Sequence, residues 1–194
     1  EVSNQYYNSL SPDQAIETIL FDDGSTFDVT GTMTFIGTSE TDMSIRGRSI
    51  ETATDILIGL EGDDRIYGGD GNDIYVWNMG DGNDIIYEGG GAADQIELGA
   101  GITTNDVRLW QDSNRTLYVH IGDEHIEVFR HFDDEYREVE TLTFNDGTTL
   151  DLLNNLTFVG HYTSEHGYGS DNDDVIYGLG GLDRLYGRDG NDII

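Results

Sequence analysis

Through residues 50–97, one apolar side chain recurs at a nearly constant interval. Each copy lies in a short run of β-prone residues, and glycine, aspartate and asparagine fill the stretches between the runs. Alternation of this kind is typical of strands with one buried face. The pattern therefore predicts very short strands joined by tight turns, with the recurring residue pointing inward. The recurring residues are Leu57, Ile66, Tyr75, Ile86 and Ile96.

The interval is a nine-residue unit that occurs in two arrays. The three best copies read GLEGDDRIY, GGDGNDIYV and MGDGNDIIY, and begin at residues 59, 68 and 79; weaker copies begin at residues 50 and 89. The second array begins at residue 169 and continues at 178 and 187. Position six is aspartate in every unit, and position eight is aliphatic or tyrosine. Because two units make one coil with two strands and two turns, we expect units n and n+2 to stack.

Trp77 and Asn78 are inserted between the second and third units of the first array. The insertion breaks the nine-residue spacing at that point. The spacing alone therefore leaves open whether Asp64 stacks on Asp84.

Between the arrays the pattern changes to longer strands with hairpin turns. Period-two alternation or β-rich runs predict strands within residues 106–110, 116–122, 124–132 and 139–152. Asp146-Gly147 lies between apolar runs and predicts a type I′ turn, and Asp23-Gly24 repeats that signal. Residues 11–20 and 133–142 carry weaker helical patterns, which leave a short helix open at each.

Composition adds a strong negative charge. The 194 residues include 39 acidic and 9 basic side chains, for a formal net charge of -30. Self-repulsion at this charge opposes compaction, yet 36% of the residues are hydrophobic, which is more than a chain that stays disordered normally has. We therefore expect the fold to depend on bound cations. No basic cluster favours nucleic acid or an anionic membrane as a partner, and no apolar run is long enough for a transmembrane segment.

The repeating unit concentrates oxygen donors in a small space. Glycine at positions one, two and four allows a tight turn with inward carbonyl oxygens, and the position-six aspartate adds a carboxylate. Stacked turns bring such carboxylates together, and neighbouring negative charges need a counter-cation. The chain has no cysteine, so all the donors are hard oxygens, which suit Ca²⁺ better than Mg²⁺. We expect several bound Ca²⁺ ions.

The unit resembles the RTX nonapeptide, G-G-x-G-x-D-x-U-x, a calcium-binding repeat. The resemblance covers residues 50–97 and 169–194. It implies a parallel β-roll with ions between stacked turns, bridged by position-six aspartates and turn carbonyls. The segment IEVFRHFDDEYREVETLTFNDGTTLDL, residues 126–152, is similar to the haemolysin-type calcium-binding-protein related domain, a module found between RTX arrays in secreted bacterial proteins.

These resemblances predict an all-β protein in which parallel β-roll arrays alternate with a small antiparallel β module. Residues 16–37 are similar to residues 139–160, which supports the alternation. Both ends of the sequence look like cuts in a longer protein. The predicted divisions are the tail of a linking β module at 1–49, a first RTX β-roll at 50–97, a linking β module at 98–160, and a second, truncated RTX β-roll at 161–194.

Carried over residue by residue, the resemblance nominates the position-six aspartates as metal ligands, with acids and glycines of the same turns beside them. The units of Asp55 and Asp94 lack glycine at position four, and Asn172 takes that place in the unit of Asp174. The position-six candidates are Asp55, Asp64, Asp73, Asp84, Asp94, Asp174, Asp183 and Asp192. The other candidate metal-site residues are Gly59, Glu61, Gly68, Asp70, Gly71, Asp81, Gly82, Asp171, Gly178 and Asp189.

No catalytic motif accompanies these repeats. The five histidines form no H-E-x-x-H pair, there is no G-x-S-x-G, and a cysteine nucleophile is absent. We expect no enzyme activity in this stretch. The resemblance implies a structural, calcium-dependent folding module of a large secreted bacterial RTX protein, such as an adhesin, exported through a type I channel and folding outside the cell.

The alternative is a calcium-dependent polysaccharide-binding module of a secreted carbohydrate-active enzyme. Aromatic rings beside carboxylates and calcium can form a sugar platform, so polysaccharide or a cell surface is a candidate partner besides the rest of a larger chain. The available rings are Trp77, Trp110, Tyr118, Tyr162 and Tyr168.

Overall fold

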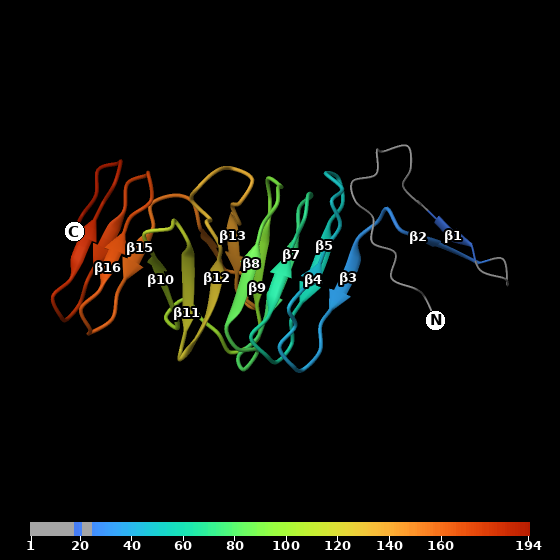
Figure 1. The fold of residues 1–194 in the computed structure, drawn as a ribbon, viewed down its shortest axis with the longest axis horizontal. Coiled ribbons are helices and arrows are strands. Elements are labelled where there is room, and N and C mark those ends of the chain that lie inside the picture. The colour runs from blue at the N-terminus through green and yellow to red at the C-terminus, as the bar shows by residue number, and fades with distance from the viewer. Residues whose placement is uncertain (1–17, 21–24) are drawn as a thin grey trace.

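From residue 33 to residue 98, consecutive strands of the chain alternate between two long sheets, so the chain winds as a coil (Figure 1). The computed structural model describes residues 18–20 and 25–194, and all the regular structure in these residues is β-strand. In spatial order, the first sheet contains β17 (Val175–Tyr177), β15 (Thr157–Val159), β10 (Val107–Gln111), β11 (Leu117–Ile121), β12 (Glu124–Val128), β8 (Asp84–Tyr87), β6 (Arg65–Tyr67) and β4 (Ile45–Arg46). The second contains β14 (Thr149–Asp151), β13 (Thr141–Thr143), β9 (Gln95–Leu98), β7 (Ile74–Trp77), β5 (Asp55–Ile58) and β3 (Met33–Ile36).

Two smaller sheets complete the described structure. An antiparallel pair joins β1 (Thr18–Leu20) to β2 (Thr26–Asp28), and a parallel pair joins β16 (His166–Tyr168) to β18 (Arg184–Tyr186). The predicted turn at Asp23-Gly24 and residues 11–17 of the first helical pattern lie outside the described residues. At residues 18–20 that helical pattern is wrong, because these residues form β1.

Units n and n+2 stack as the repeat predicts. Strands β5, β7 and β9 pair in parallel, with Ile56 opposite Ile74, and β6 pairs with β8. The insertion does not break this stacking, because Arg65 pairs with Ile85 and so keeps Asp64 beside Asp84. Trp77 ends β7 as a buried residue, while Asn78 enters the following turn. The predicted parallel β-roll is confirmed.

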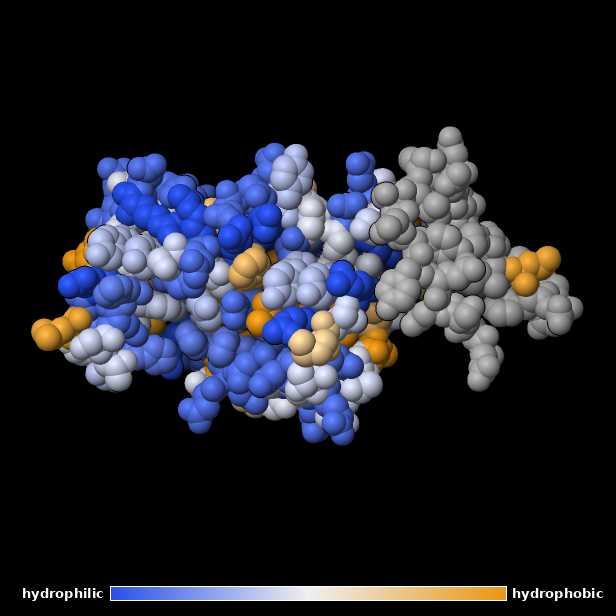
Figure 2. Space-filling view, viewed as in Figure 1, coloured by the Kyte–Doolittle hydropathy of each residue, from blue (hydrophilic) through white to orange (hydrophobic). Residues whose placement is uncertain are grey.

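The recurring apolar residues form the interior of the coil. Leu57, Ile66, Tyr75, Ile86 and Ile96 are all at most 3% exposed and belong to one core cluster. Each contributes about 1.5–3 kcal/mol relative to an exposed side chain. Hydrophilic residues dominate the surface shown in Figure 2, where apolar residues lie in separated spots. The inward orientation predicted from the sequence is confirmed.

The region between the arrays continues both long sheets. Strands β10, β11 and β12 form the predicted antiparallel ladder, but β12 also pairs in parallel with β8, and β10 with β15. Strand β13 likewise extends the second sheet from β9. The arrays and the linking strands therefore share continuous backbone hydrogen bonding, which holds the turns of both arrays on one scaffold. The predicted divisions at residues 50, 98 and 161 stay a prediction.

Two local predictions in the linking region are wrong in detail. The hairpin between β13 and β14 closes with the Gly147 N–H donating to the Phe144 carbonyl at 2.8 Å, and only Gly147 has a positive φ there. That is a type I turn followed by a left-handed glycine, not a type I′ turn. Residues 133–142 form turns and the start of β13 instead of a helix, because the Asp134 carboxylate accepts from the Tyr136 N–H and binds Arg137. In the described part of the chain, no helix could span a membrane.

Candidate metal centre

The position-six carboxylates stack in columns along the turns. In the first column, Asp73 Oδ1 accepts from the Asp55 N–H at 3.0 Å, and Asp94 Oδ1 accepts from the Asp73 N–H at 2.6 Å. Glu140 ends this column by accepting from the Asp94 N–H at 2.5 Å. Each acid thus ties its own turn to the preceding one, which fixes the spacing of the carboxylates.

A second column runs along the turns that precede the other sheet. Asp64 Oδ1 accepts from the Asp42 N–H at 2.7 Å, and Asp84 Oδ1 accepts from the Asp64 N–H at 2.9 Å. The second array repeats the arrangement on a smaller scale. Asp192 accepts from the Asp174 N–H at 3.0 Å, and Asp183 accepts from the Glu165 N–H at 3.2 Å.

Glycine at position one makes room for the carboxylate of the same unit. A Cβ on Gly68 would lie 2.8 Å from Asp73 Oδ2, and a Cβ on Gly178 would lie 2.7 Å from Asp183 Oδ2. Gly59 stands in the same relation to Asp64. At position four, Gly71 has a φ of 117° and stacks against the Ala53 carbonyl oxygen, so a side chain would be blocked there. Gly82 repeats this arrangement against the Gly62 carbonyl.

Three of these carboxylates leave one oxygen without a partner. Oδ2 of Asp64, of Asp73 and of Asp94 is buried and accepts no hydrogen bond. A buried acceptor without a partner costs about 1–3 kcal/mol, and more when it is charged. A bound cation supplies the missing interaction, so these oxygens fit a metal ion.

Two of these three aspartates, Asp73 and Asp94, belong to a compact acidic cluster. Ligand atoms of Asp73, Glu88 and Asp94 all lie within 4.8 Å of one another, and all three side chains are buried. The Tyr75 hydroxyl donates to Glu88 Oε2 from inside the coil, while the Gly89 and Gly90 N–H groups donate to Oε1. The cluster therefore has a fixed geometry and offers only oxygen, the ligand type that Ca²⁺ takes.

Burial and crowding raise the pKa of the three cluster acids and of Asp84. Burial, and then the charge of Asp94, raises the pKa of Glu88 to about 8. Burial also raises the pKa of Asp73 to about 6 and that of Asp94 to about 7, and neighbouring carboxylates add to both. Asp84, in the second column, has a pKa raised to about 7 for the same reasons. At neutral pH these groups resist full ionisation together, so a divalent cation would stabilise the ionised cluster.

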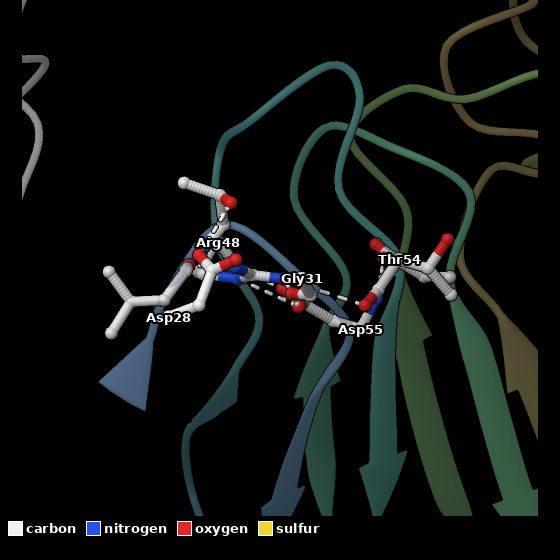
Figure 3. A network of polar contacts seen from close by, with 8 residues as sticks. Asp28, Gly31, Arg48, Thr54 and Asp55 are labelled. Atoms are coloured by element: carbon white, nitrogen blue, oxygen red, sulfur yellow. Dashed lines mark hydrogen bonds and ion pairs between the residues drawn. The ribbon is translucent and has the colours of Figure 1, made fainter. Parts of the chain in front are cut away.

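The Asp55 carboxylate forms an ion pair with a cationic side chain of the protein itself, Arg48. The Arg48 guanidinium donates to Asp55 Oδ1 from Nε at 2.8 Å, and the Arg48 N–H donates to Oδ2 at 2.6 Å (Figure 3). The same guanidinium reaches the carbonyls of Val29 and Gly31. Asp174 is satisfied differently, because Ser170 donates to its Oδ2 from both the N–H and the hydroxyl. The columns thus contain satisfied carboxylates as well as the three with an orphan oxygen.

The predicted acids at position three lie outside the columns. Asp81 accepts from the Asn78 N–H at 2.7 Å and closes the turn made by the insertion. Asp171 forms an ion pair with Arg115 at 2.8 Å. Asp70 is half-buried, whereas Glu61 and Asp189 are exposed. Their role as metal ligands stays a prediction.

Four acids of the columns and the cluster were missed from the sequence. Asp42 and Glu165 each follow a glycine by five residues, at Gly37 and Gly160, and so share the relation between positions one and six of the repeat. This spacing of five residues after a glycine is a sequence signal for Asp42 and Glu165. No such signal marks Glu140 or Glu88. Glu140 enters its column through the pairing of β13 with β9, and Glu88 is a single inserted residue after Tyr87.

Comparison with known proteins agrees with this geometry. The family described as RTX calcium-binding nonapeptide repeat (4 copies) matches residues 51–76 and 165–194. No curated protein matches the chain. Asp55, Asp64 and Asp73 lie within the first matched region, and Asp174, Asp183 and Asp192 lie within the second. The chain therefore carries RTX calcium-binding nonapeptide repeats in two regions, and its stacked turns form a β-roll.

Proposed function

We propose that this module is a structural unit of a large secreted bacterial protein and that it folds outside the cell when it binds Ca²⁺. The observation that carries the proposal is the set of buried carboxylate oxygens without partners in Asp64, Asp73 and Asp94. RTX repeats are typical of secreted bacterial proteins. A site that assembles only in the folded state makes the binding free energy of the metal part of the folding free energy.

The charge of the chain supports calcium-controlled folding. A net charge of -30 penalises the compact state, and the buried columns concentrate this penalty in the stacked turns. At the low calcium of a cytoplasm the chain would remain unfolded and suited to a type I export channel. Millimolar calcium outside would neutralise the columns and drive folding by mass action.

We also propose that this stretch has no catalytic role of its own, as in a rigid segment of an adhesin. His131, the most buried histidine, accepts from the Val139 N–H at Nδ1 and contacts the Leu152 carbonyl through Nε2. Both ring nitrogens therefore hold the linking strands together.

Far-ultraviolet circular dichroism of the whole chain, recorded at submicromolar and at millimolar free calcium, tests the proposal. We expect a disordered spectrum at the low concentration and a β-rich one at the high concentration. A spectrum that is β-rich at submicromolar calcium would contradict folding controlled by the calcium gradient.

Polysaccharide binding is the second candidate function. Trp77 and Trp110 are 2% and 8% exposed, so neither can serve as the sugar platform that the sequence left open. Tyr162 is 80% exposed and Tyr168 stacks on Tyr186 at 4.9 Å, so the second array offers one aromatic site. The half-buried ring of Tyr118 lies against His120 and His125. Calcium-dependent retention on a polysaccharide column that disappears in Tyr162→Ala would favour this function. Equal elution of both proteins would exclude Tyr162 as a sugar contact.

A further inference from the structure

Three histidines from separate segments meet on the outer face of the linking strands. His120 in β11 lies directly opposite His125 in β12, and their ring centroids are 5.5 Å apart. The His161 ring, just after β15, forms a T-shaped pair with the His120 ring at a centroid distance of 5.1 Å. All three side chains are partly exposed, whereas Val119 and Ile121 on the opposite face of β11 are fully buried. The cluster is therefore at the surface, and His125 borders the second column, because its N–H donates to Asn83 Oδ1 at 3.1 Å and the next residue, Ile126, lies opposite Asp84.

The backbone holds His161 firmly in this position. The Gly160 N–H donates to the Tyr177 carbonyl at 2.8 Å, and the His161 N–H donates to Glu165 Oε1 at 2.5 Å. A Cβ on Gly160 would lie 3.1 Å from the Trp110 ring, and Gly167 also lies against that ring. The segment from Gly160 to Gly167 thus packs over β10, and this packing delivers the third imidazole to the pair on β11 and β12.

The three imidazoles have free nitrogens. In the part of the chain that the structure describes, no protein group hydrogen-bonds to a ring nitrogen of His120, His125 or His161. Burial, and then the neighbouring imidazoles and Arg108, lowers the pKa of His120 to about 4, and burial lowers that of His125. Neutral imidazoles with available lone pairs are the form that metal ions bind.

We propose that His120, His125 and His161 form a binding site for a divalent transition-metal ion such as Zn²⁺. Given a Zn–N distance of about 2.0–2.1 Å, two imidazoles on one tetrahedral ion have ring centroids about 5 Å apart. The separations of His120 from His125 and from His161, 5.5 and 5.1 Å, match this spacing. Three nitrogen ligands suit Zn²⁺, Cu²⁺ or Ni²⁺ rather than Ca²⁺, and solvent can supply the fourth ligand at this partly exposed position.

Ring rotations would be needed to complete the site. Among the described residues, the ligand atoms already gathered within 4.8 Å are those of Asp73, Glu88 and Asp94. To bind one ion, the three imidazoles must therefore turn their nitrogens toward a common point. The positive charge of Arg108, opposite His120 on β10, disfavours a bound cation. The negative charge of Asp63, which acts on His125, favours one.

Calorimetric titration of the calcium-saturated whole chain with Zn²⁺ tests the site, because saturating calcium keeps the carboxylates occupied. We expect one Zn²⁺ per chain and an affinity that falls at least about tenfold in His161→Ala, a loss at the low end of that seen when support of a metal ligand is removed. His166→Ala is the matched control, since His166 is an exposed histidine on β16 outside the cluster. We expect His166→Ala to bind Zn²⁺ like the unchanged protein.

His161 is in a surface segment, so its variant should keep the fold, which circular dichroism in calcium would verify. His125→Ala provides a second test from a different strand, with the same expected loss. Absence of Zn²⁺ binding, equal affinity in His161→Ala and the unchanged protein, or equal losses in His161→Ala and His166→Ala would overturn the proposal and leave the histidines as a packing cluster.

Discussion

Replacing Arg48 by glutamine removes the cation that the protein itself supplies to the first column. The Arg48 side chain is 15% exposed and that of Asp55 is 0% exposed, so the ion pair is shielded from water. Besides Asp55, the guanidinium binds the Val29 carbonyl at 2.5 Å and the Gly31 carbonyl at 2.8 Å. Glutamine is shorter and neutral, and it would leave a buried carboxylate without a counter-charge.

The size of the effect follows from the burial of the ion pair. Breaking a buried ion pair by removing one partner costs about 3–5 kcal/mol, because it leaves an uncompensated charge in the interior. We therefore expect Arg48→Gln to lower the free energy of unfolding by about 3–5 kcal/mol.

Urea unfolding followed by circular dichroism, at calcium that just saturates the unchanged protein, measures this loss. Arg130→Gln is the matched control, because Arg130 is 49% exposed and pairs with Asp133 at 3.6 Å; we expect a loss below about 1 kcal/mol. Adding Asp55→Asn to Arg48→Gln should recover most of the loss, since it removes the stranded charge. More calcium should also recover part of it in the single variant, because the freed Asp55 carboxylate becomes one more anionic site.

Two results would refute the reasoning about Arg48. One is an Arg48→Gln variant as stable as Arg130→Gln, which would mean that the ion pair contributes nothing measurable. The other is a double variant no more stable than Arg48→Gln alone, which would mean that the stranded carboxylate is not the source of the loss.

Three further predictions concern the columns. Asp73→Asn should raise the calcium midpoint of folding at least about tenfold, whereas Asp123→Asn, in an exposed turn, should not; equal midpoints in calcium titrations would remove Asp73 as a ligand. In chelator, the raised pKa values of Asp73, Asp84, Glu88 and Asp94 mean that the folded state binds more protons than the unfolded state, so their stabilising contribution is complete below about pH 4 and is lost as the pH rises through about 6 to 8. With saturating calcium the pH dependence of stability should reverse. A thermal unfolding temperature that falls with rising pH in both conditions would contradict this prediction. Gly68→Ala should destabilise the calcium-bound protein by about 1–3 kcal/mol, because its Cβ would lie 2.8 Å from both Asp73 Oδ2 and Glu88 Oε2. The control is Gly31→Ala, which has open space around it and should change stability to urea little. Similar stability of the two variants would exclude crowding at position one.

The repeat itself made much of the fold predictable. Every position-eight residue of the first array points inward, because a period of nine with fixed glycines admits one register of strand and turn. The stacking of Asp73 on Asp55 followed from the same period. The repeat also implied the pairing of Asp64 with Asp84 once the insertion was absorbed in a turn.

The contacts between distant segments could not be read from the repeat. The parallel pairing of β12 with β8 joins the linking strands to the first array, and no local pattern specifies which edge a strand extends. Arg48 reaches Asp55 from outside any recognisable unit, and Glu88 enters the acidic cluster through a one-residue insertion. These residues have their roles only because the coil brings separate turns together.

The most direct test of the account is a crystal structure of the calcium-bound protein with ions located by anomalous scattering. We predict ions within about 2.3–2.6 Å of the orphan oxygens of Asp64, Asp73 and Asp94, and none at Asp55, where Arg48 stands. Ions confined to exposed loops, with the buried cluster of Asp73, Glu88 and Asp94 empty at saturating calcium, would contradict the claim that these columns are the calcium sites.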